Sequence, residues 1–273
     1  MRSRALTSPS AGICVSTSDP LRVYWYRRHA NFGDQLTEVL LERLAGIRVR
    51  WTRAKKAEFV GAGSIAADLP RGFQGIVFGT GKHSADARID LSRAHVLCVR
   101  GALTLEGSGA SCDVLGDPGL LCGFIAPEVQ PTRSLAVVPH LRDRSLAHRF
   151  DGHVVDVGGG VDRVISEVAS CERVVTSSLH GLILADALGL PRRWELFPRV
   201  QADGFKFHDY ASALGECLEP GRWQRANPAT VAGVQARLLD LLQVVVDAVK
   251  RRSGHGRPSA SWVDPWFSDR SER

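Results

Sequence analysis

The 273-residue sequence lacks a long apolar run and any cysteine pattern of a metal site. No stretch approaches the length of a transmembrane helix, so we expect a soluble protein. The six cysteines form no Cys-x-x-Cys pair and no zinc spacing with histidine, and no carboxylate pair or histidine cluster demands a metal. The start of the chain has no apolar signal core, and we therefore expect a reducing, cytoplasmic location.

The sequence also lacks the basic stripe with interleaved aromatics that nucleic-acid binding favours. Its net charge of +6 comes mainly from scattered arginines, which fits anionic small substrates or the inner face of an anionic membrane. No Gly-x-Gly-x-x-Gly segment opens a helix after the first expected strand. We therefore predict no nucleic-acid partner and no nicotinamide or flavin cofactor.

What the sequence does contain is an alternation of short β-branched segments with helical patterns, which predicts α/β structure with mostly parallel sheets. The expected strands are Arg22–Tyr26, Phe59–Gly61, Gly75–Phe78, His95–Val99, Ser134–Val138, His153–Val157, Arg173–Thr176 and Arg193–Leu196. The expected helices are Asp34–Leu44, Val161–Ser170, Leu179–Leu188 and Thr230–Val249. Prolines 127 and 131 mark a linker between Rossmann-like domains at 20–128 and 129–252.

The two ends of the chain, residues 1–19 and 253–273, are predicted to be poorly ordered because they are rich in small and polar residues. The C-terminal tail nevertheless carries Trp262, Trp266 and Phe267 close to several arginines. We expect these aromatics to fold back onto the second domain. The alternative is peripheral membrane contact, for which aromatics beside cations are suited.

The most informative segment is 174–191, where a β-branched run passes through Ser177 and Ser178 into an apolar helix. His180 falls in the first turn of that helix. A helix start offers unpaired N–H groups and a partial positive charge, which suit an anion and disfavour an imidazolium. His180 is therefore expected to be neutral and basic near pH 7. An ordinary N-cap at Ser178, with no function for His180, fits the spacing equally well.

Further short motifs accompany this histidine segment along the chain. They are Asn31-Phe32-Gly33-Asp34, Gly61-Ala62-Gly63-Ser64, Gly79-Thr80-Gly81, Arg100-Gly101-Ala102-Leu103-Thr104, Leu115-Gly116-Asp117-Pro118, Val138-Pro139-His140 and Gly204-Phe205-Lys206-Phe207-His208-Asp209-Tyr210. Taken individually, most of the glycines are explained by turn chemistry. Together and in this order, the segments resemble the polysaccharide pyruvyl transferase family over residues 31–210. The resemblance implies two facing Rossmann-like domains of the GT-B type.

The resemblance also implies a reaction, the transfer of an enolpyruvyl unit from phosphoenolpyruvate to two hydroxyls of a sugar. The product is a cyclic pyruvate ketal on a cell-envelope or extracellular polysaccharide, or on its lipid-linked precursor, and phosphate is released. Phosphoenolpyruvate would be a co-substrate, and no cofactor is expected. His180 is the expected proton-transfer residue, with Asp34 orienting the acceptor or relaying a proton. A simpler role for Asp34 is to stabilise the start of its own helix.

The donor carries a carboxylate and a phosphate, which guanidinium groups and helix starts bind well. Arg100 matches the family's arginine and is the first expected donor ligand, followed by Arg142. The remaining expected anion ligands are Ser177, Ser178, Lys82 and Lys206. Asp117, just before a proline, is predicted to form a turn rather than to act in catalysis. His140 and His208 also match positions of the family motifs, but the sequence assigns them no chemical role.

Two other functions remain open from the sequence. A GT-B glycosyltransferase with a nucleotide-sugar donor would use the same fold and the same phosphate contacts. A non-catalytic binding subunit of a polysaccharide-assembly complex is the third candidate, although the joint presence of His180, Asp34 and Arg100 counts against it. The sequence does not define the acceptor sugar, the hydroxyls used or the oligomeric state.

Overall fold

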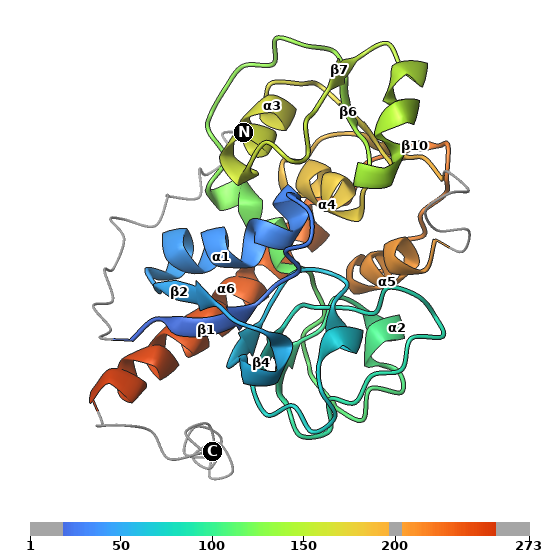
Figure 1. Cartoon of the computed structure of the whole chain (residues 1–273). Coiled ribbons are helices and arrows are strands. Elements are labelled where there is room, and N and C mark those ends of the chain that lie inside the picture. The colour runs from blue at the N-terminus through green and yellow to red at the C-terminus, as the bar shows by residue number, and fades with distance from the viewer. Residues whose placement is uncertain (1–18, 197–203, 255–273) are drawn as a thin grey trace.

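The computed structural model describes residues 19–196 and 204–254, which form two five-stranded sheets with helices packed around them (Figure 1). The first sheet has the order β2-β1-β3-β4-β5 and is parallel throughout. The second has the order β10-β9-β8-β6-β7, with only β10 antiparallel. The predicted α/β class with mostly parallel sheets is thus confirmed.

The strands are β1 (Leu21–Tyr24), β2 (Val49–Trp51), β3 (Phe59–Val60), β4 (Ile76–Phe78), β5 (His95–Cys98), β6 (Ala136–Val138), β7 (His153–Val154), β8 (Val174–Thr176), β9 (Arg192–Trp194) and β10 (Trp223–Gln224). The α-helices are α1 (Phe32–Ala45), α2 (Ala102–Leu105), α3 (Val161–Ala169), α4 (Leu179–Ala187), α5 (Phe205–Leu214) and α6 (Pro228–Gly254). Short 3-10 helices are η1 (Ala54–Lys56), η2 (Ala66–Asp68), η3 (Pro118–Phe124) and η4 (Leu141–Arg149). Every strand and helix expected from the sequence is present, whereas β2, β10, α2 and α5 were not expected.

Helices α1 and α4 differ in how they are buried. In α1 the Asn31 side chain caps the start by accepting from the Gly33 N–H, and Gly46 ends the helix in the left-handed region. Its buried side chains lie on one face, as the three-to-four spacing predicts. In α4 every residue from Leu179 to Asp186 is buried, because this helix lies between other elements. An all-round apolar helix is what such a position requires.

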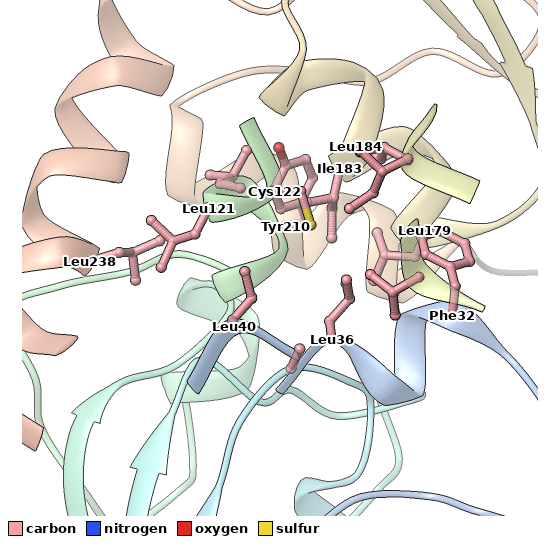
Figure 2. Packing of buried hydrophobic residues seen from close by; sticks show 14 of the residues in the cluster. Phe32, Leu36, Leu40, Leu121, Cys122, Leu179, Ile183, Leu184, Tyr210 and Leu238 are labelled. Atoms are coloured by element: carbon pink, nitrogen blue, oxygen red, sulfur yellow. The ribbon is translucent and has the colours of Figure 1, made fainter. Parts of the chain in front are cut away.

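The two halves of the molecule share one hydrophobic core. Figure 2 shows Phe32 and Leu36 of α1 near Leu179 and Ile183 of α4, with η3, α5 and α6 completing the cluster. A backbone hydrogen bond of 2.8 Å from the N–H of Phe32 to the carbonyl of Val157 also joins the halves. The first and second sheets are therefore held together by packed side chains.

The segment around residue 128, where the sequence places a linker, is exposed coil over residues 127–134. Helix α5 lies between β9 and β10 in sequence and α6 follows β10, yet α5 packs against α2 and α6 packs against η3 and α1 of the first half (Figure 1). The C-terminal part of the chain thus returns to cover the first sheet.

Helix α6 is, among the described residues, the one helix long and apolar enough to cross a membrane by length and composition. No segment of this kind was expected from the sequence. In the structure its apolar face packs into the core, with Val234, Leu238 and Val245 fully buried. Near its end, Arg252 donates to Glu58 at 3.0 Å. This packing accounts for the apolar face of α6 as a core face. The three tail aromatics lie outside the described residues.

Candidate active site

A cleft of about 1120 Å³ lies where loops from both sheets meet. Its lining comes from the segments that follow β1, β3, β4, β6 and β8, and from the first turn of α5. Because parallel strands bring their carboxyl ends to one edge, this is the usual position of a ligand site in open α/β sheets. Of the expected site residues, the cleft brings together Asp34, Arg142, Ser178, His180 and Lys206.

His180 is the second residue of α4, and its ring lies against the start of α1. Its edge meets the ring of Phe32, with centroids 6.3 Å apart. A Cβ at position 33 would overlap the imidazole, so Gly33 is required for this close approach. The glycine of the Asn-Phe-Gly-Asp motif is thus explained by the histidine motif that lies 147 positions later in the sequence, rather than by turn chemistry.

The His180 ring is neutral at pH 7, as the sequence analysis expected. Burial, together with the nearby charges of Lys206, Arg100 and His140, lowers its pKa to about 3. Desolvation is the largest cause of this shift. A buried neutral imidazole can accept a proton once a negatively charged ligand offsets the surrounding cations.

Asp34 lies in the first turn of α1 and lines the cleft from the first-sheet side. Asn31 donates a hydrogen bond of 3.1 Å to its Oδ2. Burial raises the pKa of Asp34 to about 6, while Asn31 and Lys206 act in the opposite direction. The pKa of Asp34 therefore lies close to neutral pH, and Asn31 holds its carboxylate in place. Such a group is suited to exchange protons with a hydroxyl.

Lys206 reaches the cleft from α5, a helix that the sequence analysis did not predict. Its side chain is buried, and its Nζ lies 5.4 Å from the ring centroid of Phe207. Burial and the charge of Arg100 lower its pKa to about 8, against the opposing effect of Asp143 and Asp34. Within the described residues Lys206 forms no salt bridge, and a desolvated ammonium of this kind is suited to bind an anion.

Arg142 and Ser178 line the cleft from the second-sheet side. The backbone N–H of Arg142 donates to Nδ1 of His140 at 3.2 Å, which leaves the exposed guanidinium at the rim. Ser178 occupies the N-cap position of α4, but its hydroxyl makes no capping hydrogen bond to the described residues. Thr176 Oγ1 instead accepts from the Ser178 N–H at 2.9 Å. Ser178 is therefore the N-cap residue of α4 by position, as one of the two sequence interpretations expected, but not through its side chain.

Arg100 lies beneath the cleft and does not line it. Its side chain is fully buried: Nε donates to Asp209 at 2.8 Å, Nη1 donates to Ser64 at 2.6 Å, and Nη2 donates to the carbonyl of Lys82. All three nitrogens are thus engaged by the protein, and a donor anion would have to displace one of these partners. The geometry differs from the direct contact expected from the sequence, because α5 supplies Asp209 as the partner of the guanidinium.

Lys82 and Ser177 are also outside the cleft lining. The Nζ of Lys82 lies 5.2 Å from the ring centroid of Phe205. The hydroxyl of Ser177 accepts from the backbone N–H of His140 at 2.9 Å, which joins the loops after β6 and β8. Both side chains therefore hold the walls of the cleft in position from behind.

Some cleft residues were not singled out in the sequence. Tyr26, Asp68 and Arg144 line the cleft as well. Tyr26 ends the first expected strand, and this place at the carboxyl end of a strand was the one sequence signal that could have marked it as a cleft residue. Asp68 and Arg144 carry no local pattern, because only the fold brings them to the cleft. His208 is exposed and meets Trp194 edge-on at 5.4 Å, away from the lining residues.

Within residues 19–196 and 204–254, no group of three His, Cys, Asp or Glu side chains is arranged to hold a metal ion. Cys98, Cys122 and Cys171 are buried thiols, and Cys112 is partly buried. Cys217 is exposed. The cleft itself presents an imidazole, carboxylates, hydroxyls and cationic groups.

Residues 59–194 match the family model described as polysaccharide pyruvyl transferase. The chain is also 28% identical over 216 residues to the uncharacterized protein L143 of Acanthamoeba polyphaga mimivirus, covering 71% of this chain and 74% of the viral protein. It is 28% identical over 215 residues to the succinoglycan biosynthesis protein ExoV of Rhizobium meliloti (strain 1021), covering 73% of this chain and 66% of ExoV. The chain belongs to the polysaccharide pyruvyl transferase family.

Proposed function

We propose that the protein transfers a pyruvyl unit from phosphoenolpyruvate to two hydroxyls of a saccharide, forming a cyclic ketal. The family and the likeness to ExoV support a transferase with a role in polysaccharide modification. One observation carries the finer proposal: a single cleft combines cationic groups, a neutral buried histidine and a carboxylate of raised pKa. In this proposal the two sheets correspond to the two halves of a GT-B-like arrangement.

The two sides of the cleft carry different charge. The basic wall comprises His140, Arg142, Arg144, Ser178 and Lys206, from the second half of the chain. The first half contributes the two carboxylates of the lining, and we call Tyr26, Asp34 and Asp68 the acidic wall; His29 and His83 line the cleft on the same side. His180 lies between the two walls, on α4 but against the start of α1. This division fits one anionic substrate and one neutral substrate that is rich in hydroxyls.

The donor is assigned to the basic wall because phosphoenolpyruvate carries a phosphate and a carboxylate. Arg142 and Lys206 are the first candidates to hold these groups, with the start of α4 as a further anion site. Arg144 forms an ion pair with Asp156, so it is a weaker candidate. Negative charge at this wall would raise the pKa of His180, because it offsets Lys206 and Arg100. Donor binding would thereby make the imidazole a better base.

The acceptor is assigned to the acidic wall, where carboxylates and a phenol can accept and donate hydrogen bonds to sugar hydroxyls. One hydroxyl oxygen bonds to C2 of the donor, and its proton passes through His180 to C3, which becomes a methyl group. The bond from C2 to the phosphate oxygen then breaks as the second hydroxyl oxygen bonds to C2. The second proton leaves with the phosphate, with Asp34 as the acceptor that relays it.

The test is incubation with phosphoenolpyruvate and candidate oligosaccharide acceptors, following phosphate release and acceptor mass together. The proposal expects equal amounts of phosphate and ketal product, and loss of both with His180→Gln. Nucleotide sugars serve as the competing donors. Transfer of a glycosyl unit from a nucleotide sugar, with none from phosphoenolpyruvate, would overturn the proposal in favour of a glycosyltransferase.

A further inference from the structure

Asp117, at the start of η3, is a fully buried carboxylate to which the reaction above assigns no role. Its Oδ1 accepts from the Gly119 N–H at 2.8 Å, which confirms the turn-forming role predicted from the sequence. Its Oδ2 is buried and has no hydrogen-bond partner among the described residues. Leaving a buried carboxylate oxygen unpaired is unfavourable, so a residue kept in this state calls for an explanation.

The complementary group lies directly opposite. Nε2 of His180 is also buried and without a hydrogen-bond partner in the described part of the chain. It lies 4.0 Å from Oδ2 of Asp117. This distance is about 1 Å longer than a hydrogen bond. Hydrogen bonds at active sites are often long in the ligand-free protein and shorten when substrates bind.

The surroundings leave His180 as the available partner of this oxygen. Arg100 lowers the pKa of Asp117, but its three nitrogens bind Asp209, Ser64 and the Lys82 carbonyl. Burial raises the pKa of Asp117 to about 6, so the carboxyl is mostly ionised at pH 7 and acts as an acceptor.

The carboxylate is also held in place by close packing. Pro118 packs so tightly against Gly79 that a Cβ at position 79 would overlap its ring. A Cβ at Gly119 would lie 3.0 Å from Ile183 of α4, which shows how closely η3 approaches the helix that carries His180. The carboxylate and the imidazole are therefore presented to each other by two elements in direct contact.

We propose that Asp117 is a positioning residue for His180, accepting a hydrogen bond from Nε2–H and thereby fixing the tautomer of the ring. Nδ1, which lies on the side of Gly33, then keeps the free electron pair for proton transfer. The functional meaning of this contact rests on the proposed catalytic role of His180. The hydrogen bond and the tautomer do not depend on that role.

Asp117→Asn separates positioning from simple turn formation. Its amide oxygen can still accept from the Gly119 N–H, while its amide nitrogen would donate to Nε2 and move the ring proton to Nδ1. We expect kcat to fall by roughly two to four orders of magnitude, with the KM for phosphoenolpyruvate changed less than about twofold. Asp113→Asn removes the same charge from an exposed position of the same segment and should change neither constant.

The direct measurement is the imidazole 15N spectrum, with the His180 signals assigned through His180→Gln. The wild-type protein should hold the Nε2–H tautomer, and Asp117→Asn should reverse it. An Nδ1–H tautomer in the wild type would overturn the proposal even if the variant failed to fold. An unchanged tautomer in folded Asp117→Asn would overturn it as well. Reversal of the tautomer without any pyruvyl transfer by the wild type would instead contradict the proposed function and leave the positioning role standing.

Discussion

The basic and acidic walls are built from the same kind of element, loops at the carboxyl ends of parallel strands, yet they differ in charge. The basic wall gains its buried cation, Lys206, from α5, which packs against α2 of the first half. The acidic wall gains Asp34 from the first turn of α1. The division of charge therefore depends on how the two halves are joined, not on the sheets themselves.

Two buried cations near the cleft, Arg100 and Lys206, differ in whether the protein itself pairs them. Arg100 is fully paired within the protein and joins α5 to the loops of the first sheet. Lys206 faces the cleft with a pKa lowered to about 8 by burial. A paired guanidinium contributes to the structure, whereas a desolvated ammonium in a cleft is available to an anion.

The largest effect is expected at His180, between the walls. His180→Gln should reduce kcat by roughly two to four orders of magnitude, because it removes the proton-transfer group. The melting temperature should change little, because glutamine is polar and of similar size. Steady-state phosphate release and a thermal melt check both points. Near wild-type turnover would remove the histidine from the mechanism.

The next effect compares Lys206, which lines the cleft, with Lys82, which does not. Lys206→Met should weaken phosphoenolpyruvate binding by about 10- to 100-fold, the usual range for a lost charge-assisted hydrogen bond. Lys82→Met is the matched control and should leave affinity unchanged, because Lys82 does not line the cleft. Calorimetric titration of both variants provides the measurement. Equal losses in the two variants would mean that Lys206 has no special place in donor binding.

The pH dependence should report one group from each wall. Activity that needs ionised Asp34 rises through pH of about 6, and activity that needs protonated Lys206 falls above pH of about 8. The profile of kcat/KM should therefore be bell-shaped, changing about tenfold per pH unit on each limb. Asp117 and the donor phosphate also titrate near 6. Asp34→Asn distinguishes these groups, because the acid limb should remain in this variant only if Asp34 does not cause it.

The smallest effect is expected on the acidic wall at Tyr26. Tyr26→Phe removes one hydroxyl and should raise the KM of the acceptor by about 2- to 10-fold, the effect of one hydrogen bond. The KM of phosphoenolpyruvate should stay the same. Measuring both constants with one acceptor oligosaccharide is sufficient. A change in the donor constant alone would reverse the assignment of the two walls.

Much of the fold could be predicted because period and turn residues are local signals. The apolar stripe of α1 and the run into α4 were visible in the sequence, whereas β2 was missed because Val49–Trp51 is short and includes an arginine. The roles of buried polar groups could not be predicted in the same way. Arg100 finds its partner Asp209 at a separation of 109 residues, and only the fold shows that its guanidinium is occupied. Likewise, only the fold shows that Oδ2 of Asp117 is buried and faces Nε2 of His180.

The central claim is that the basic wall binds phosphoenolpyruvate, and thermal melting of the protein with and without ligand tests it directly. Phosphoenolpyruvate should raise the melting temperature of the wild type, because a ligand that binds the folded state stabilises it. The rise should be lost when Arg142→Ala and Lys206→Met are combined, and it should persist in Asp34→Asn. A rise with nucleotide sugars alone, or an undiminished rise in the double variant, would contradict the account.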